Sequence, residues 1–304
     1  MPDDIKQLDS SLGCPSFTAA TQDGTGCVAV IATYNEIENL PLLTKQIHDL
    51  FPAMQVLVID DNSPDSTGGW AEEFSKDHSW LSLISRSGKL GLGSATIAGF
   101  RWAMARNFSK IFTMDADFSH APDQIERLLK ASLKRDLTSE NSPVPAKRSS
   151  ILGEAPTNAS PPTTAAGTVV IGSRYIAGGK IEGWPLGRRI ASRLINGFAR
   201  FWLQLSSHDN SGAFRCYDHS LLRTIDLNHI TNQGYGYLEE ILYLARRAGG
   251  AVIEVPITFR DRTRGQSKIS FWDAFSALLT LTRLGFRLRL TRSTATANST
   301  KKSY

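Results

Sequence analysis

Apolar and polar residues succeed one another along the first half of the chain in a regular pattern. The short apolar runs Val28–Thr33, Val56–Asp60, Leu81–Ser85 and Lys110–Met114 have the length and composition of buried strands. Each run is followed by a turn or glycine-rich loop and then by a segment with helical spacing of apolar residues. The rhythm resumes with a strand at Thr168–Gly172. It predicts an α/β fold with a mainly parallel central sheet and helices on both faces.

Segments of different composition mark the organisation of the chain. Residues 1–26 are polar and aperiodic, and residues 136–167 are rich in Ser, Pro, Thr and Ala. Neither segment can bury enough apolar surface to offset the entropy of ordering, so we expect a disordered N-terminal segment and a disordered insertion. The insertion would interrupt a single domain of residues 27–268. Residues 269–290 predict an amphipathic helix and residues 291–304 a disordered basic tail.

Charge is concentrated at the C-terminal end. The chain has 304 residues, 41% of them apolar, and a formal net charge of +5. Residues 260–304 contain ten Lys and Arg against two Asp, a local net charge of +8. This distribution argues against a nucleic-acid-binding protein and favours an acidic or phosphorylated partner near that end. The C-terminal helix is expected either to pack against a protein partner or to lie in a membrane interface, and its arginine cluster favours the membrane.

Cysteine usage and the absence of targeting signals indicate the compartment. Cys14, Cys27 and Cys216 are an odd number without metal-ligand spacing, which is typical of a reducing compartment. The first residues have neither a basic nor an apolar signal region, and no run of about 18 apolar residues occurs. We expect a cytoplasmic protein that is peripherally associated with the cytoplasmic face of a membrane.

Two aspartates, Asp115 and Asp117, follow the fourth expected strand. Strand alternation puts residues two apart on the same side, about 7 Å from each other at roughly 3.3 Å per residue. Such carboxylates repel unless protons or a cation compensate. Mg²⁺ or Mn²⁺, held by one or two carboxylates and substrate phosphates, fits this arrangement. A solvated strand end without a ligand is the alternative.

Further polar motifs follow the carboxyl ends of the other expected strands, where open α/β sheets bind ligands. They are Ala32-Thr33-Tyr34-Asn35-Glu36, Ile59-Asp60-Asp61-Asn62-Ser63-Pro64-Asp65 and Lys89-Leu90-Gly91-Leu92-Gly93-Ser94-Ala95. Together with the paired aspartates they resemble the nucleotide-sugar half of glycosyltransferase family 2, which has the GT-A fold.

The resemblance extends over about residues 28–270, apart from the insertion. The later motifs look like the dolichol-phosphate, or polyprenol-phosphate, mannosyltransferase branch of that family. They are Gly172-Ser173-Arg174-Tyr175, Gly183-Trp184 with Arg188, Asp209 with Ser211-Gly212-Ala213-Phe214-Arg215, Gly234-Tyr235 with Glu240, and Asp261-Arg262 with Gly265-Gln266-Ser267-Lys268. The chain departs from the branch at Ala32, Thr96, Ser211 and Leu238.

The resemblance implies roles on the donor side. Asp117 is the first candidate for metal ligand, with Ser119 and Asp115 as further candidates. Candidate donor-binding residues are Thr33, Tyr34, Glu36, Asp60, Asp61, Asp115, Ala116, Arg262, Ser267 and Lys268. A capped turn is the alternative for the Asp60–Asp61 motif, because Asp and Asn favour turns on their own. A solvated basic loop is the alternative for the residues after Asp261.

The expected acceptor explains why no general base stands out. A phosphomonoester is mostly dianionic at neutral pH, so it needs cations and hydroxyl groups rather than a base. Arg174, Arg188 and Ser192 supply that set, and with Asp117 the two arginines are the candidate catalytic residues. For Arg188 an ordinary surface arginine is the alternative. His120 is interpreted as a structural residue.

The resemblance implies a metal-dependent, inverting transfer of mannose from GDP-mannose to a polyprenyl phosphate, giving polyprenyl phosphate mannose and GDP. A UDP-sugar donor for the same lipid is the nearest alternative. A non-catalytic nucleotide-sugar or lipid-binding module is a more distant one. A nicotinamide-dependent oxidoreductase is disfavoured, because the third glycine of the dinucleotide fingerprint is replaced by Thr96.

Overall fold

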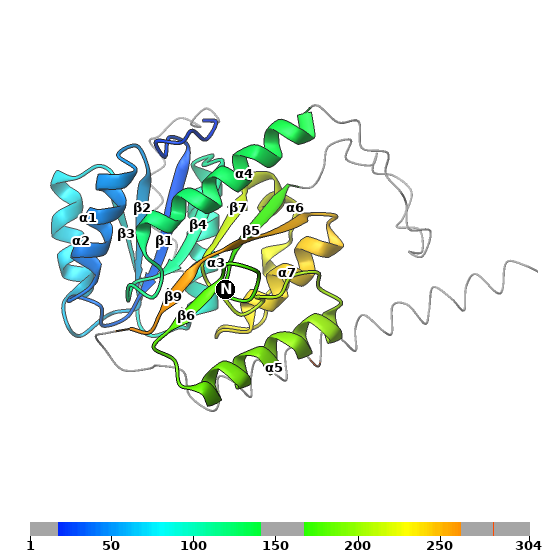
Figure 1. Cartoon of the computed structure of the whole chain (residues 1–304). Helices are drawn as coiled ribbons and strands as arrows, with labels where there is room; N and C mark the ends of the chain where they lie inside the picture. The colour runs from blue at the N-terminus through cyan, green and yellow to red at the C-terminus, as the bar shows by residue number, and fades with distance from the viewer. Residues whose placement is uncertain (1–17, 141–166, 263–281, 283–304) are drawn as a thin grey trace, which may run out of the picture.

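The computed structural model describes residues 18–140, 167–262 and Thr282 (Figure 1). The strands are β1 (Cys27–Thr33), β2 (Gln55–Asp60), β3 (Leu81–Ser85), β4 (Lys110–Asp115), β5 (Thr168–Ser173), β6 (Lys180–Glu182), β7 (Arg215–Asp218), β8 (Ala251–Pro256) and β9 (Thr258–Arg260). The α-helices are α1 (Leu40–Leu50), α2 (Thr67–Asp77), α3 (Leu92–Ala105), α4 (Ile125–Glu140), α5 (Leu186–Leu203), α6 (His219–Thr224) and α7 (Tyr237–Arg247). Short 3₁₀ turns cover Pro122–Gln124 and Leu227–His229.

Within the described residues, seven strands form one sheet in the order β3-β2-β1-β4-β7-β5-β8. Neighbours are parallel except at β7, which runs antiparallel to both β4 and β5. The small pair β6-β9 is parallel as well. The expected α/β fold with a mainly parallel sheet is confirmed. The carboxyl ends of β1, β2, β4 and β5 therefore reach the same edge of the sheet.

Side chains of the central strands point alternately into two hydrophobic layers, one on each face of the sheet. On β1, Val28 and Val30 belong to one buried cluster, whereas Cys27, Ala29 and Ile31 belong to the other. All five side chains are at most 2% exposed, because the parallel sheet is covered on both faces. This explains why β1 reads as a continuous apolar run rather than as an alternating one.

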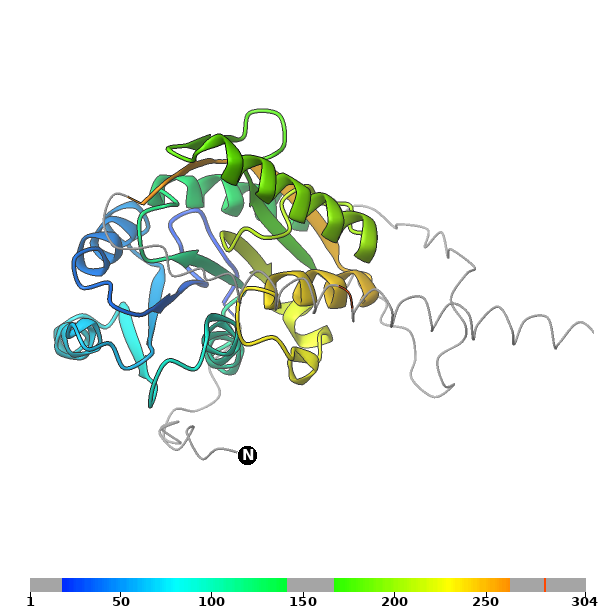
Figure 2. The ribbon, with the colours of Figure 1, turned by 90° about the horizontal axis from the view of Figure 1, so that it is seen from below.

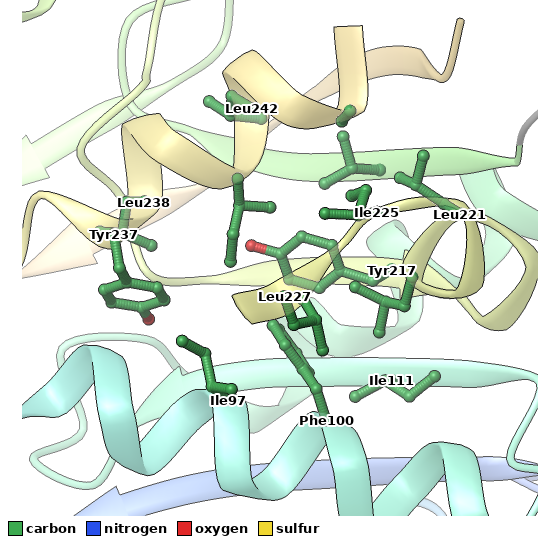
Figure 3. Close-up of a cluster of buried hydrophobic side chains, with 14 of the residues drawn as sticks. Ile97, Phe100, Ile111, Tyr217, Leu221, Ile225, Leu227, Tyr237, Leu238 and Leu242 are labelled. Carbon is green, nitrogen blue, oxygen red and sulfur yellow. The ribbon is translucent and has the colours of Figure 1, made fainter. Parts of the chain in front are cut away.

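Helices from different parts of the chain cover the two faces (Figure 2). One cluster takes its helical residues from α1, α2 and α4. The other takes them from α3, α5, α6 and α7, and Figure 3 shows Phe100 of α3 beside Tyr217 of β7 in that layer. Their ring centroids are 5.0 Å apart in an edge-on arrangement. This layer joins the first half of the chain to the second.

The boundaries of two segments expected to be disordered differ from the prediction. Residues 18–26 form a turn in which Asp23 accepts bonds from Thr25, and Thr18 bridges to Phe108. Helix α4 continues through residues 136–140, where the insertion was expected to begin. Residues 1–17, 141–166 and most of the C-terminal helix and tail lie outside the described residues. No helix in the described part is long and apolar enough to span a bilayer.

A buried ion pair joins β4 to β7 at the antiparallel junction. The ammonium of Lys110 lies 2.7 Å from Asp218 and 2.8 Å from Asp136. Asp218 also accepts hydrogen bonds from Ser132 of α4 and from the backbone of Thr168. Burial is the largest influence on the pKa of Lys110 and lowers it, but the charges of Asp218 and Cys216 and the hydrogen bonds to Asp136 and Asp218 together raise the net pKa. The carboxylate of Asp218 therefore connects its own strand β7 to β4, α4 and β5.

Replacing Asp218 with Asn should lower the free energy of unfolding by about 3–5 kcal/mol, because Lys110 would lose its buried counter-charge. Asp136 is the matched control, since its side chain is 45% exposed and Asp136→Asn should cost at most about 1 kcal/mol. Urea denaturation of the three proteins measures both values. Equal losses in the two variants would contradict the account.

Candidate active site

A cavity of about 210 Å³ opens at the carboxyl edge of the sheet. Its walls combine four carboxylates with two cations and the backbone of a glycine-rich loop. The lining residues are Ala32, Thr33, Tyr34, Glu36, Asp61, Lys89, Gly91, Leu92, Ala95, Asp115, Ala116, Asp117, Gly234, Tyr235 and Arg262. The cavity thus lies where strand order and direction place a ligand crevice in α/β sheets.

Residues 115–119 are here called the acidic turn, and three of them, Asp115, Ala116 and Asp117, line the cavity. Asp115 ends β4, and Phe118 adopts a left-handed conformation with φ of 60°. This conformation is costly for a bulky residue and turns the chain sharply. The backbone N–H of Ser119 consequently reaches back to Asp117 at 3.0 Å. The other oxygen of Asp117 lies 3.5 Å from Arg262.

The acidic turn concentrates carboxyl groups whose charge Arg262 offsets only in part. Burial and then the neighbouring carboxylate of Asp117 raise the pKa of Asp115 to about 7, although Arg262 opposes the shift. No group of three or more His, Cys, Asp or Glu side chains suited to a metal ion occurs within residues 18–140 and 167–262. Two carboxylates nevertheless fit Mg²⁺ or Mn²⁺, which commonly take their remaining ligands from substrate phosphates and water. Such an ion would also relieve the repulsion between Asp115 and Asp117.

Asp60 and Asp61 point in different directions although they are adjacent. Asp60 accepts bonds from Thr33 at 3.2 Å and from Ser63 at 2.9 Å, so it organises the turn after β2. Asp61 faces the cavity and pairs with Arg86 at 2.8 Å. Burial, only partly offset by Arg86, raises the pKa of Asp61. The capped-turn alternative therefore describes Asp60, and the cavity residue is Asp61.

The glycine-rich loop is held against the cavity by Asp61. The second carboxylate oxygen of Asp61 accepts hydrogen bonds from the backbone N–H groups of Leu90 and Gly91 at 3.0 and 3.3 Å. Gly91 has φ of 97°, and a Cβ there would lie 2.4 Å from the carbonyl oxygen of Gln233. Lys89 consequently projects over the ring of Tyr34, 4.8 Å from its centroid. A flat aromatic face beside a cation suits a nucleotide base next to its phosphates.

Arg174, which directly follows β5, forms an ion pair with the buried carboxylate of Asp209. Its Nε and Nη2 atoms donate to the two oxygens of Asp209 at 2.7 and 2.6 Å, and Nη2 also donates to Ser211 at 3.1 Å. Burial is the largest influence on the pKa of Arg174 and lowers it, but the charge and hydrogen bonds of Asp209, together with Tyr175 and Asp115, raise the net pKa. The bidentate pair fixes the loop before β7 onto the end of β5.

A basic-aromatic cluster surrounds this pair. It consists of Arg174, Tyr175, Trp184, Arg188 and Ser192. The guanidinium carbons of Arg188 and Arg174 lie 4.0 and 5.4 Å from the centroid of the Trp184 ring. The hydroxyl of Tyr175 donates to Ser192 at 2.6 Å. The three residues predicted for a phosphate thus lie in one neighbourhood.

His120 is 2% exposed and lies between aromatic rings rather than at the cavity wall. It stacks on Phe214 with centroids 5.0 Å apart and meets Phe259 edge-on. Burial lowers its pKa to about 4, despite the charge of Asp117. His120 is therefore neutral at physiological pH, in agreement with a structural residue.

The structure brings together most of the predicted donor-side residues. Thr33, Tyr34, Glu36, Asp61, Asp115, Ala116, Asp117 and Arg262 all line the cavity. Asp60 and Ser119 do not line the cavity but form hydrogen bonds within the turns that follow β2 and β4. Ser267 and Lys268 lie outside the described residues. The prediction did not single out Arg86, Lys89, Asp209 or Asp261. Arg86 directly follows a strand, and the other three stand in the motifs described above, so each left a signal in the sequence.

Solved structures with this fold are known. Glucosyl-3-phosphoglycerate synthase from Mycobacterium tuberculosis, in complex with phosphoglyceric acid, superposes with a TM-score of 0.54 and 17% identity. The match covers 86% of this chain and 81% of that one. A structure of the same enzyme with Mn²⁺, UDP-glucose and phosphoglyceric acid gives a TM-score of 0.52 at 17% identity, over 87% and 81% of the two chains. The expected GT-A fold is confirmed.

Relatives of higher identity define the family. Polyprenol monophosphomannose synthase of Mycolicibacterium smegmatis is 35% identical over 267 residues, 88% of this chain and 89% of the relative. Undecaprenyl-phosphate mannosyltransferase of Micrococcus luteus is 37% identical over 262 residues, 86% of this chain and 95% of the relative. Residues 28–139 match the family described as glycosyl transferase family 2. This chain is a glycosyltransferase and belongs to glycosyl transferase family 2.

Proposed function

We propose that the protein transfers a mannosyl group from GDP-mannose to the phosphate of a polyprenyl lipid, with inversion at the anomeric carbon. The products are polyprenyl phosphate mannose and GDP. The names of both relatives support this acceptor and this sugar. The observation that carries the proposal is that the acidic turn and the basic-aromatic cluster are neighbours, because the adjacent residues Asp261 and Arg262 contact Arg188 of the cluster and Asp117 of the turn.

On the donor side, Tyr34, Glu36 and Asp61 bind the nucleoside in this proposal. Carboxylates accept the N–H groups of a base edge, and the Tyr34 ring offers a stacking face. Lys89 and Arg262 attract the diphosphate. Asp115 and Asp117 would hold Mg²⁺ or Mn²⁺, with Ser119 assisting through its backbone bond to Asp117. When bound, the ion neutralises the charge that develops on the departing diphosphate.

On the acceptor side, the lipid phosphate attacks as a dianion, so no side chain has to remove a proton. Arg188 and Ser192 bind its oxygens in this proposal. Nε and Nη2 of Arg174 donate to Asp209 and Ser211. Within the described part of the chain, Nη1 is therefore the nitrogen that remains for the acceptor phosphate in this proposal. Asp209 thereby orients the guanidinium. One phosphate oxygen forms the bond to the anomeric carbon as the bond to the GDP oxygen breaks.

The membrane surface is the proposed location of the acceptor. Helix α5 exposes Leu186, Ile190, Leu194 and Phe201 to the extent of 71, 50, 68 and 73%. Arginines accompany these apolar side chains along the helix. A helix with apolar and basic surface suits an interface rich in anionic lipid. The C-terminal helix expected from the sequence to bind the membrane lies outside the described residues except for Thr282, and the cytoplasmic face stays a prediction.

Asp117→Asn should reduce transfer by about 100-fold or more, because one charge needed to hold the cation at the diphosphate is removed. The fold should be unchanged, as measured by thermal melting. Asp49→Asn is the control, since Asp49 is 54% exposed and makes only a surface pair with Lys45. Wild-type rates in Asp117→Asn would refute the role of the acidic turn.

Incubation of the protein with a polyprenyl phosphate and labelled GDP-mannose should move label into the organic phase, and chelation of divalent cations should stop it. Parallel reactions with UDP-glucose test the alternative donor. Preferential transfer from the UDP-sugar would replace the proposed donor. Binding of nucleotide sugars without any transfer would favour the non-catalytic module instead.

A further inference from the structure

Two consecutive residues after β9 contact the two halves of the site in opposite directions. The carboxylate of Asp261 accepts from Nη1 of Arg188 at 3.1 Å. The guanidinium of the next residue, Arg262, lies 3.5 Å from the carboxylate of Asp117. A carboxylate therefore pairs with the proposed acceptor-side cation, and a guanidinium pairs with a proposed donor-side acid.

The backbone around this dipeptide is held on both sides. Arg260 donates its N–H to the carbonyl of Ser119 in the acidic turn at 3.1 Å, and Asp261 donates its N–H to Glu182 of β6 at 2.9 Å. Gly183 has φ of 82°, and a Cβ there would lie 2.8 Å from Cβ of Asp261. Because consecutive Cα atoms are about 3.8 Å apart, a backbone shift at either residue is transmitted to the other.

Resting on the proposed function, we propose that Asp261 and Arg262 form a latch that couples the occupancy of the donor and acceptor sites. When the cation and the diphosphate occupy the cavity, Arg262 leaves Asp117 for the diphosphate. The linked movement withdraws Asp261 from Arg188, whose guanidinium then receives the acceptor phosphate. Asp261 is a positioning residue in this account, because it acts through Arg188 and touches neither substrate.

Electrostatic competition supplies the driving force. A divalent cation beside Asp117 repels Arg262, while the diphosphate attracts it. The acceptor phosphate and the carboxylate of Asp261 compete for the same guanidinium, so acceptor binding is weak while that pair is intact. The donor should consequently bind first. By linkage, donor and acceptor must raise each other's affinity by the same factor.

A neighbouring ion pair provides a matched control. Arg260 pairs with Glu182 at 3.1 Å, the same distance as the pair of Arg188 and Asp261. Both of its side chains are more than half exposed, and neither lines the cavity. Arg260→Gln therefore removes an ion pair from the same strand end without touching the latch.

Calorimetric titration with a short-chain prenyl phosphate tests the latch without turnover. Wild-type protein should bind the probe about tenfold more tightly when GDP and Mn²⁺ are present, a typical strength for coupled sites. Asp261→Asn should bind the probe without nucleotide about as tightly as the wild type binds it with nucleotide. Arg260→Gln should behave as the wild type.

Equal affinity of the wild type with and without GDP and Mn²⁺ would overturn the latch and leave the proposed acceptor intact. An Asp261→Asn affinity unchanged from the wild type would do the same. If Asp261→Asn fails to fold, the wild-type comparison still decides. Absence of probe binding to the folded wild type in every condition would refute the proposed acceptor, and the latch with it.

Discussion

Electrostatic repulsion between Asp115 and Asp117 is the interaction on which the site depends. The parallel strands bring both carboxylates to one edge of the sheet, and the left-handed turn at Phe118 keeps them there. Burial makes their charge costly, as the raised pKa of Asp115 indicates. In the proposed function a divalent cation lowers that cost, and the diphosphate of the donor supplies its remaining ligands.

Two buried ion pairs hold β7 and the loop before it in place within the sheet. Lys110 and Asp218 fix the antiparallel junction at β7, and Arg174 and Asp209 fix the loop before β7 onto β5. None of these four residues lines the cavity, and Lys110 stands at the amino end of β4, at the opposite edge of the sheet. Such pairs add orientation more than net stability, because desolvation offsets much of their attraction. The ion pair of Arg174 and Asp209 thereby fixes the proposed acceptor side to β5. Asp261 and Arg262, in contrast, contact both the acceptor side and the donor side.

Sequence reasoning predicted the sheet and many of the residues that line the cavity, because strand periodicity determines which side chains reach the carboxyl edge. Asp115 and Asp117 were found in this way, and Glu36 was found through the family resemblance. It could not separate Asp60 from Asp61, since the turn geometry after β2 decides which of two adjacent carboxylates faces the cavity. The antiparallel insertion of β7 and the pairing of Arg174 with Asp209, 35 residues away, depend on tertiary packing that no local pattern encodes.

The central claim is that the acidic turn holds a divalent ion against the diphosphate of the donor. Phosphorus NMR of GDP, titrated with the protein and Mn²⁺, measures this most directly, because the paramagnetic ion broadens only nearby nuclei. Because Mn²⁺ also binds free GDP, its concentration is kept too low to broaden the signals of GDP alone. Both phosphorus signals of protein-bound GDP should then broaden in the wild type and remain sharp when Asp115 and Asp117 are both replaced with Asn. Sharp signals from GDP bound to the wild type in the presence of Mn²⁺ would contradict the claim.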